Sequence, residues 1–373
     1  MGKTVVVVGA GLTGGASANS IKRKLGKNDS VKLITTSDHV GYFPALVRVP
    51  FSNNYDAFAP LSEVIDEDVE IIQGRVVYFN ESSVSLENGE VIEFDALVIA
   101  TGSKWPNPIS TSAVYGNDYK GFYKSEGEKI KNANDIVFIG GGFVNVEFVG
   151  ELYHIYKDDI ESGKKRVSII QNSDKLLPDS PFYTDKFRTK ITQWFDETEI
   201  KLYLKSKGEI TESDKGQVII NGNQKIKADL IYIGIGVQPI VPKNEISELT
   251  NDKGFIRTNK NFKVKANSKG NIFAIGDVTD FQYHGVQKLH NWIPTIASNV
   301  TSYLQDGSNA KLIDASTFEN ENIPAGVSLG PNDGFGQYPF PLIGTVILPR
   351  FLIAMAKSKD LFVSSWRKMT YDN

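Results

Sequence analysis

Residues 3–14 read KTVVVVGAGLTG and predict a strand, a tight turn and the start of a helix. The segment Lys3–Val8 is apolar and β-branched, as expected for a strand that is buried on both faces. Small and apolar residues then recur at nearly helical spacing over 16–21, and a second apolar strand is expected at Val31–Thr35. This order is typical of the βαβ unit of an α/β fold.

The glycine spacing inside this unit is typical of a dinucleotide-binding loop. Gly9 permits the turn, Gly11 lets a pyrophosphate approach the backbone, and Gly14 lets the helix pack closely on the strand. Leu12 and Thr13 stand between these glycines, where the helix N-terminus offers free N–H groups to phosphates. The alternative is a glycine turn with a purely structural role.

The end of the second strand departs from the usual pattern. An acidic residue commonly stands there and binds the ribose hydroxyls. This chain has Thr35 and Thr36 instead. We expect Thr35 to contact the ribose, without the strength of a charge-assisted hydrogen bond.

A second strand–glycine–helix unit follows near the middle of the chain. The apolar strand Asp135–Ile139 leads into Gly140, Gly142 and Phe143, and Asn145 replaces the third glycine. We interpret this loop as the second dinucleotide site. A Rossmann-like half that binds nothing is the alternative.

The strand after this loop, Val167–Ile170, again ends without an acid, in Gln171 and Asn172. Nothing there would repel a 2′-phosphate, and Lys175 is near in sequence. The sequence therefore does not separate NADH from NADPH.

Two further strands end in small residues. One ends in Ala100, Thr101 and Gly102, and the other, Asn271–Ile275, ends in Gly276 and Asp277. A glycine followed by aspartate allows close backbone approach and supplies a carboxylate to the hydroxyls of a flavin ribitol. Between the two loops, Asn88-Gly89 predicts a hairpin with a type I′ turn.

Composition excludes several classes of protein. The chain has 373 residues, a formal charge of -3 and 40% hydrophobic residues, which argue against a disordered chain or a general nucleic-acid binder. It has no cysteine, so disulfides, iron–sulfur clusters, thiolate zinc sites and cysteine nucleophiles are excluded. The four histidines form no metal-binding motif, and no metal site is expected.

No targeting or transmembrane segment is expected. The uncharged stretch Gly334–Pro349 is shorter than a bilayer helix and contains three prolines. Met1-Gly2 suggests N-myristoylation, but Val6 stands where that motif has serine or threonine. We expect a cytoplasmic protein and leave membrane, mitochondrial or nuclear association open.

Taken in order, the motifs resemble those of the flavoprotein reductases that bind two dinucleotides. The resemblance spans nearly the whole chain and is strongest to the apoptosis-inducing-factor-like branch, with its ferroptosis-suppressor-like and fungal members. Three stretches carry it most specifically: Phe43–Arg48, Gly326–Gln337 and Lys357–Phe362.

This resemblance implies an α/β fold with two Rossmann-like domains. An FAD-binding domain (1–113 and 246–307) would be interrupted by an NAD(P)H-binding domain (114–245), and a small C-terminal α+β unit (308–373) would follow. The implied cofactors are FAD and, as cosubstrate, NADH or NADPH.

The resemblance also assigns roles to residues around the FAD. Pro44 and Arg48 would lie beside the cofactor, and Val76 would touch the adenine through its backbone. Asp277 would bond the ribitol or a nearby phosphate, and Lys288 would approach the isoalloxazine.

Four more residues would serve the two substrates. Glu147 and Gly236 would shape the nicotinamide pocket. Lys357 and Phe362 match a tail that closes over the quinone side of the flavin in the ferroptosis-suppressor-like members.

Without cysteine, electrons cannot leave the flavin through a redox disulfide. We therefore expect an enzyme, an FAD-dependent NAD(P)H oxidoreductase that passes electrons directly to a quinone-type acceptor. Lys288 would stabilise negative charge on the reduced flavin, and a solvated surface lysine is the alternative. Rival hypotheses are a redox-switched signalling flavoprotein with low turnover and a ferredoxin- or rubredoxin-type reductase.

The C-terminal segment Leu348–Met369 mixes apolar residues with five bases and one acid. A packed helix with a solvated cationic face, or a dimer contact, explains this pattern most simply. The alternative is peripheral membrane contact through Arg367 and Lys368, which would let the enzyme collect lipid quinones.

Overall fold

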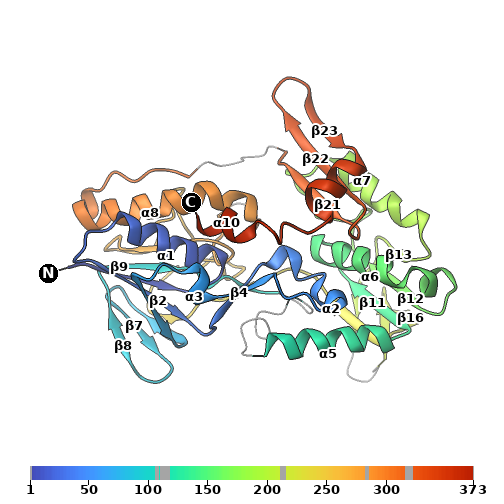
Figure 1. Cartoon of the computed structure of the whole chain (residues 1–373), viewed down its shortest axis with the longest axis horizontal. Helices are drawn as coiled ribbons and strands as arrows, with labels where there is room; N and C mark the ends of the chain where they lie inside the picture. Colours follow the sequence, from blue (N-terminus) through green and yellow to red (C-terminus); the bar gives the residue numbers. More distant parts are fainter. Residues whose placement is uncertain are drawn as a thin grey trace.

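The computed structural model describes residues 2–105, 109, 118–210, 216–281, 285–315 and 322–372. Figure 1 shows two lobes side by side, each built around a parallel sheet, and an antiparallel hairpin that rises from the second lobe. The predicted α/β fold class is confirmed by this arrangement.

The first lobe contains a five-stranded parallel sheet with the order β20-β9-β1-β2-β5. Its last strand in sequence, β20, lies at one edge beside β9, so the chain returns to this sheet after passing through the second lobe. The five strands are β1 (Thr4–Val8), β2 (Ser30–Thr35), β5 (Val69–Gln73), β9 (Ala96–Ile99) and β20 (Ile272–Ala274).

Both faces of this sheet are covered, which explains the four consecutive valines of β1. Val5 and Val7 join the core formed with α1 (Leu12–Lys24) and α8 (Leu289–Asp306). Val6 and Val8 join a second core beneath the sheet β19-β6-β7-β8. That sheet consists of β6 (Val76–Phe79), β7 (Ser83–Leu86), β8 (Val91–Glu93) and β19 (Lys243–Asn244).

The predicted hairpin between β7 and β8 is confirmed, but the predicted turn type is wrong. Gly89 has a φ of +89°, and it is the one residue of the loop 87–89 with a positive φ. Its N–H donates to the carbonyl of Leu86 at 3.0 Å. A type I′ turn needs two residues of positive φ, so this loop is a three-residue turn that ends in a glycine bulge.

The second lobe repeats the plan with a four-stranded parallel sheet, β13-β12-β11-β17. Alternate residues of β11 again enter two cores. Ile136 and Phe138 pack with the helices α5 (Tyr119–Asn132) and α6 (Phe143–Glu161), whereas Val137 and Ile139 pack with the sheet β14-β15-β16. The strands are β11 (Asp135–Ile139), β12 (Arg166–Ile170), β13 (Lys201–Tyr203), β14 (Gly208–Glu209), β15 (Gln217–Ile220), β16 (Gln224–Lys227) and β17 (Leu230–Ile233).

The C-terminal segment contributes to both lobes. An antiparallel sheet of β21 (Ala325–Ser328), β22 (Gly334–Phe340) and β23 (Gly344–Leu348) lies against α6 and α7 (Asp185–Trp194). After α9 (Arg350–Ile353) and η5 (Ala354–Ser358), the chain crosses to α10 (Trp366–Tyr371), which packs on α1 and α8.

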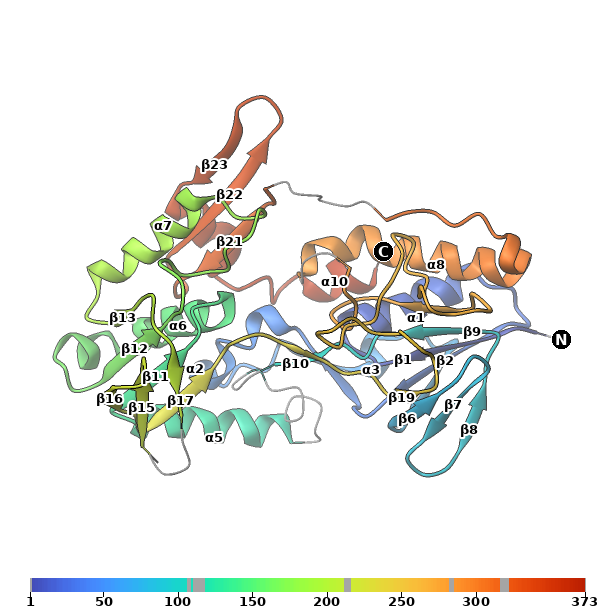
Figure 2. The same ribbon diagram turned by 180° about the vertical axis from the view of Figure 1, so that it is seen from behind.

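A short antiparallel pair, β10 with β18, joins the two lobes where the chain crosses between them (Figure 2). In the part of the chain that the structure describes, no helix combines the length and apolar character needed to span a membrane. The remaining elements are β3 (His39–Gly41), β4 (Phe58–Pro60), β10 (Ser103–Lys104), β18 (Gln238–Pro239), α2 (Val49–Ser52), α3 (Leu61–Val64), η1 (Phe43–Ala45), η2 (Phe195–Glu197), η3 (Val286–Lys288) and η4 (Gly307–Asn309).

Candidate functional site

One cavity of about 1700 Å³ runs between the lobes and reaches both glycine loops. Pockets for a single drug-sized ligand usually measure about 300–1,000 Å³. The cavity is therefore large enough to admit more than one extended ligand. Its walls come from the ends of β1, β2, β9 and β20, the N-terminus of α6 and the C-terminal segment.

The first glycine loop packs against its neighbours too tightly for larger residues. A Cβ on Gly9 would lie 2.5 Å from the carbonyl oxygen of Ala100. A Cβ on Gly14 would lie 1.9 Å from the carbonyl oxygen of Gly9. The loop therefore brings α1 close to the sheet and leaves its backbone open to the cavity.

The start of α1 is suited to a pyrophosphate. Its N-cap, Gly11, contributes no side-chain cap, and the first turn of the helix contains no acid. The N–H groups of that turn and the positive end of the helix dipole are thus available to an anion. Gly276 completes the cradle, because a Cβ there would lie 3.0 Å from the hydroxyl oxygen of Thr13. These residues fit the diphosphate of FAD.

The hydroxyl of Thr35, which we expect to contact the ribose, is engaged in a local turn. It accepts the N–H of Ser37 at 3.2 Å and donates to the carbonyl of the same residue at 3.3 Å. Thr35 lines the cavity together with Arg75 and Lys243, two exposed cations that the sequence analysis did not identify. The parallel pairing of β19 with β6 sets Lys243 opposite Tyr78, three residues after Arg75, and no local sequence pattern reveals this.

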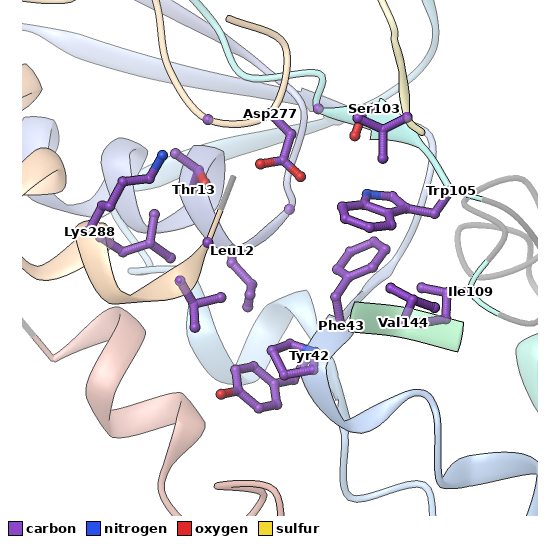
Figure 3. A pocket seen from close by; sticks show the side chains of 18 of the residues that line it. Leu12, Thr13, Tyr42, Phe43, Ser103, Trp105, Ile109, Val144, Asp277 and Lys288 are labelled. Atoms are coloured by element: carbon purple, nitrogen blue, oxygen red, sulfur yellow. The ribbon is translucent and has the colours of Figure 1, made fainter. Parts of the chain in front are cut away.

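Lys288 is buried beside the first cradle. Its side chain is 5% exposed, and its Nζ lies 3.9 Å from the ring centroid of Trp292. Burial lowers the pKa of Lys288 to about 7, although Asp277 acts in the opposite direction. In Figure 3, Lys288 and Thr13 lie on one side of the pocket and Asp277 points into it. The alternative of a solvated surface lysine is excluded by this burial.

The second glycine loop has the same backbone plan. Gly140 has a φ of +97°, and a Cβ there would lie 2.4 Å from the carbonyl oxygen of Gly234. The N-cap of α6, Gly142, again contributes no side-chain cap, and the first turn again lacks an acid. The residues therefore fit the diphosphate of a second dinucleotide.

Asn145 fills the place of the third glycine in this loop. It is 1% exposed, and its Nδ2 donates to the carbonyls of Gly140 at 2.8 Å and Ile139 at 3.3 Å. The helix and the strand are thus joined by a side-chain amide where the first loop has direct contact. Gln171 supports the same loop, because its Oε1 accepts the N–H of Gly141 at 2.9 Å.

Several aromatic side chains line the cavity between the loops. The rings of Phe143 and Tyr183 lie 5.0 Å apart. Phe43 and Trp105 face each other across 6.4 Å on the side opposite Lys288 (Figure 3). Sequence analysis missed Trp105 and Tyr183; Trp105 stands three residues after the strand end at Gly102, which was the available signal.

A chain of polar contacts joins α6 to the C-terminal segment at the cavity wall. The Oε1 of Glu147 accepts the N–H of Ser328 at 3.0 Å and the Nζ of Lys357 at 2.5 Å. Lys357 also donates to the carbonyl of Gly326 at 2.6 Å. Phe362, with a φ of +63°, lines the same part of the cavity.

Arg48 lies outside the cavity lining and has other partners. Its guanidinium donates to Glu151 at 2.5 Å and to the carbonyls of Ser358 and Lys359. Burial raises the pKa of the Glu151 carboxyl, and Arg48 opposes this effect. Arg48 thus ties α6 to the C-terminal segment, and its expected place beside FAD stays a prediction.

The crossing between the lobes involves the predicted strand end at Ala100. The hydroxyl of Thr101 donates to the carbonyl of Ile240, and the N–H of Ile240 donates to the carbonyl of Gly102 at 3.0 Å. These contacts place Thr101 and Gly102 at the junction of the two lobes.

The structure brings most of the predicted site residues to one cavity. Gly14, Gly140 and Arg48 do not line it, although both glycines shape its loops. The predicted residues that do line it are Gly9, Gly11, Leu12, Thr13, Thr35, Pro44, Val76, Ala100, Thr101, Gly102, Gly142, Phe143, Asn145, Glu147, Gly236, Gly276, Asp277, Lys288, Lys357 and Phe362. Across the described ranges, no group of three or more His, Asp or Glu side chains is arranged to hold a metal ion.

Comparison with known proteins agrees with this architecture. Residues 3–298 match the family model of the pyridine nucleotide-disulphide oxidoreductases. Apoptosis-inducing factor 1 of Saccharomyces cerevisiae is 47% identical over 363 residues, which cover 96% of each chain. Ferroptosis suppressor protein 1 of Xenopus tropicalis is 25% identical over 98% of this chain and 95% of its own.

Among solved structures, the sulfide:quinone oxidoreductase of Aquifex aeolicus superposes with a TM-score of 0.76 at 18% identity, covering 100% of this chain and 93% of its own. This likeness shows the fold. Together with the two glycine loops and their shared cavity, the matches place the chain in the pyridine nucleotide-disulphide oxidoreductase family, in its apoptosis-inducing-factor-like branch, with FAD and NAD(P)H as cofactors.

Proposed function

We propose that this protein is an FAD-dependent NAD(P)H oxidoreductase that reduces a quinone-type acceptor without a redox disulfide. The domain division suggested by the sequence, 1–113 with 246–307, 114–245 and 308–373, is part of this proposal. So are the roles of the individual site residues.

The observation that carries the proposal is the part of the cavity wall that the C-terminal segment lines with apolar side chains. Leu348, Ile353 and Phe362 line it together with Tyr338 from the hairpin, and the same cavity reaches both glycine loops. A flat, apolar acceptor fits such walls better than a charged one, because burying an unpaired charge is costly. The absence of cysteine from the chain removes the disulfide acceptor that the family name refers to.

The residues have distinct tasks in this proposal. When bound, FAD supplies the two-electron exchange between the nicotinamide and the acceptor. The first turn of α1 binds its diphosphate, and Asp277 accepts hydrogen bonds from its hydroxyls. The buried ammonium of Lys288 stabilises negative charge that develops near it, because the surrounding dielectric is low.

Reduction of a quinone also requires protons at the acceptor. The Nζ of Lys357 donates a hydrogen bond to the Oε1 of Glu147 at the cavity wall. We assign to this pair the task of holding a proton beside the acceptor. Phe362 covers the same region and excludes water.

An anaerobic titration of the purified yellow protein tests the proposal. NADH or NADPH bleaches the flavin absorption, and a water-soluble quinone then restores it within the time of mixing. Failure of both nucleotides to bleach the flavin, or failure of every quinone to restore it, would refute the proposed function.

The name of the 47% identical relative supports a second candidate, a redox-controlled signalling protein. The two candidates differ in turnover. Negligible turnover with every acceptor, together with an NADH-dependent change in elution volume on gel filtration, would favour signalling.

A further inference from the structure

The tip of the β22–β23 hairpin is the most exposed apolar feature of the described chain. Leu342 is 97% exposed and Ile343 is 73% exposed, in the turn between the two strands. Figures 1 and 2 show the hairpin projecting from the second lobe, away from the rest of the molecule. Clustered apolar side chains of this exposure mark a surface that meets a protein or a membrane.

The composition of the hairpin favours a lipid surface. No Asp or Glu occurs from 334 to 359, and the charges in that stretch are the cations Arg350, Lys357 and Lys359. The hairpin itself, 334–348, has no carboxylate that would repel the phosphates of lipid headgroups. Tyr338 and Phe340, 44% and 40% exposed, lie on the hairpin below its tip, as aromatic residues do at a membrane interface.

The same segment also forms a wall of the cavity. In α9 and η5, Phe351 and Met355 face outward with exposed fractions of 63% and 73%. Ile353 and Lys357, which alternate with them, line the cavity, as does Tyr338 of the hairpin. Apolar side chains thus lie both on the outer surface of this segment and on the side that lines the cavity.

The basic C-terminal helix is packed on the first lobe. In α10, Trp366 is buried and its indole N–H donates to the carbonyl of Asp56. Arg367 pairs with Glu63 at 2.6 Å and donates to the carbonyl of Phe58. The packed helix is therefore the correct interpretation for Trp366 and Arg367.

We propose that the protein docks on a phospholipid bilayer by inserting the tip of the β22–β23 hairpin, with Leu342 and Ile343 in the acyl region. The docked segment places the apolar wall of the cavity at the membrane, where an apolar quinone enters. The docking proposal rests on the proposed function for the identity of the acceptor. Binding to the bilayer itself is measured without enzyme turnover.

The absence of native cysteine allows a direct test on the holoenzyme. Leu342→Cys is labelled with an environment-sensitive fluorophore and mixed with vesicles of phosphatidylcholine and phosphatidylglycerol. We expect a blue shift of the emission, because the label enters an apolar phase. Val91→Cys is the matched control, since Val91 is a 59% exposed residue of another hairpin. No shift at position 342, or an equal shift at position 91, overturns the proposal.

A second experiment removes the apolar tip. Leu342→Asp combined with Ile343→Asp should weaken co-sedimentation with the same vesicles about a hundredfold, because two aliphatic side chains lose their burial. Flavin content and turnover with a water-soluble quinone should stay unchanged, whereas turnover with a long-chain quinone embedded in the vesicles should fall. Unchanged co-sedimentation contradicts the docking.

Two further outcomes separate the hypotheses. If the wild-type protein binds vesicles but no quinone reoxidises it, docking stands and the proposed function fails. The other outcome is that the wild type is a dimer, that the tip variant is a monomer, and that neither protein binds vesicles. In that case a second copy of the chain covers the tip, and the docking proposal is wrong.

Discussion

The two glycine loops share a backbone plan but join helix to sheet in different ways. At Gly14 the helix α1 touches the first loop directly, with no space for a Cβ. At the equivalent position, Asn145 keeps α6 connected to its loop through hydrogen bonds to Gly140 and Ile139. One contact depends on the absence of a side chain, and the other depends on the presence of one.

This difference corresponds to different demands on the two cradles. A direct backbone contact has no rotamer to lose, and it suits a site that holds a resident cofactor. We propose that the amide linker of the second loop suits a site that a cosubstrate enters and leaves. The following predictions test this comparison, beginning with the largest expected effect.

Gly14→Val should abolish the first cradle. Its Cβ would lie 1.9 Å from the Gly9 oxygen and 2.9 Å from the Ala100 Cβ, so the helix would have to move. We expect a colourless protein that is destabilised by about 3 kcal/mol or more. Flavin absorbance per chain and urea unfolding measure both effects.

The control for this substitution is Gly26→Ala, at an exposed position just after the same helix, where a Cβ meets a flexible Asp29 carboxylate at 3.3 Å. It should retain both flavin and stability. A yellow, stable Gly14→Val protein would show that close packing is not what the first loop requires.

Lys288, beside the first cradle, should give the stability of the protein a pH dependence. Its pKa is about 7 in the folded protein and 10.5 ordinarily, so the unfolded chain binds a proton that the native chain does not between these values. The free energy of unfolding of the apoprotein should therefore rise with pH across this window, by at most about 1.4 kcal/mol for each pH unit. Lys288→Met should remove this rise.

Urea unfolding at several pH values measures the slope, and the exposed lysine variant Lys253→Met is the control. A slope that survives in Lys288→Met would show that another group titrates in this window.

Asn145→Ala should weaken the second loop alone. It removes the donor from two buried carbonyls, at an expected cost of about 1–3 kcal/mol in the free energy of unfolding. The KM for NADH should rise, whereas flavin content should not change. Steady-state kinetics and urea unfolding measure these effects.

A matched control is Asn299→Ala, because Asn299 is 0% exposed and its Nδ2 bridges two carbonyls in the first lobe. It should lose similar stability without a change in KM. An equal change of KM in both variants would mean that the effect is general and not local to the loop.

Gln171→Ala should have the smallest effect. It removes the hydrogen bond to Gly141, worth about 0.5–1.5 kcal/mol, and loosens the loop. Because the amide is already bonded to Gly141 and Ser173, the KM values for NADH and NADPH should rise by the same factor. A loss of 0.5 kcal/mol corresponds to about a two- to threefold rise. Unequal changes would show that Gln171 distinguishes the two nucleotides.

Local sequence patterns predicted the parts of the site that depend on backbone geometry. The glycine loops, the strand ends at Gly102 and Gly276, and the return of the chain to the first sheet all follow from short motifs. The β7–β8 hairpin was also predicted, but its turn type was not, because Asn88-Gly89 is compatible with more than one loop length.

Contacts between distant residues were not predictable in the same way. The pairing of Arg48 with Glu151 joins residues 103 positions apart, and Lys357 meets Glu147 across 210 positions. The exposure of Leu342 depends on how the hairpin projects, which its uncharged sequence does not reveal. Tertiary packing determines these ion pairs and the exposure of Leu342, and the periodicity of the sequence does not reveal them.

The stoichiometry of reduction tests the central claim most directly. In an anaerobic titration, one equivalent of NADH or NADPH per bound FAD should bleach the flavin completely, and one equivalent of quinone should restore it, because the chain has no cysteine pair to store further electrons. Bleaching that needs two equivalents per FAD, or that no quinone reverses, would contradict direct transfer from the flavin to the acceptor.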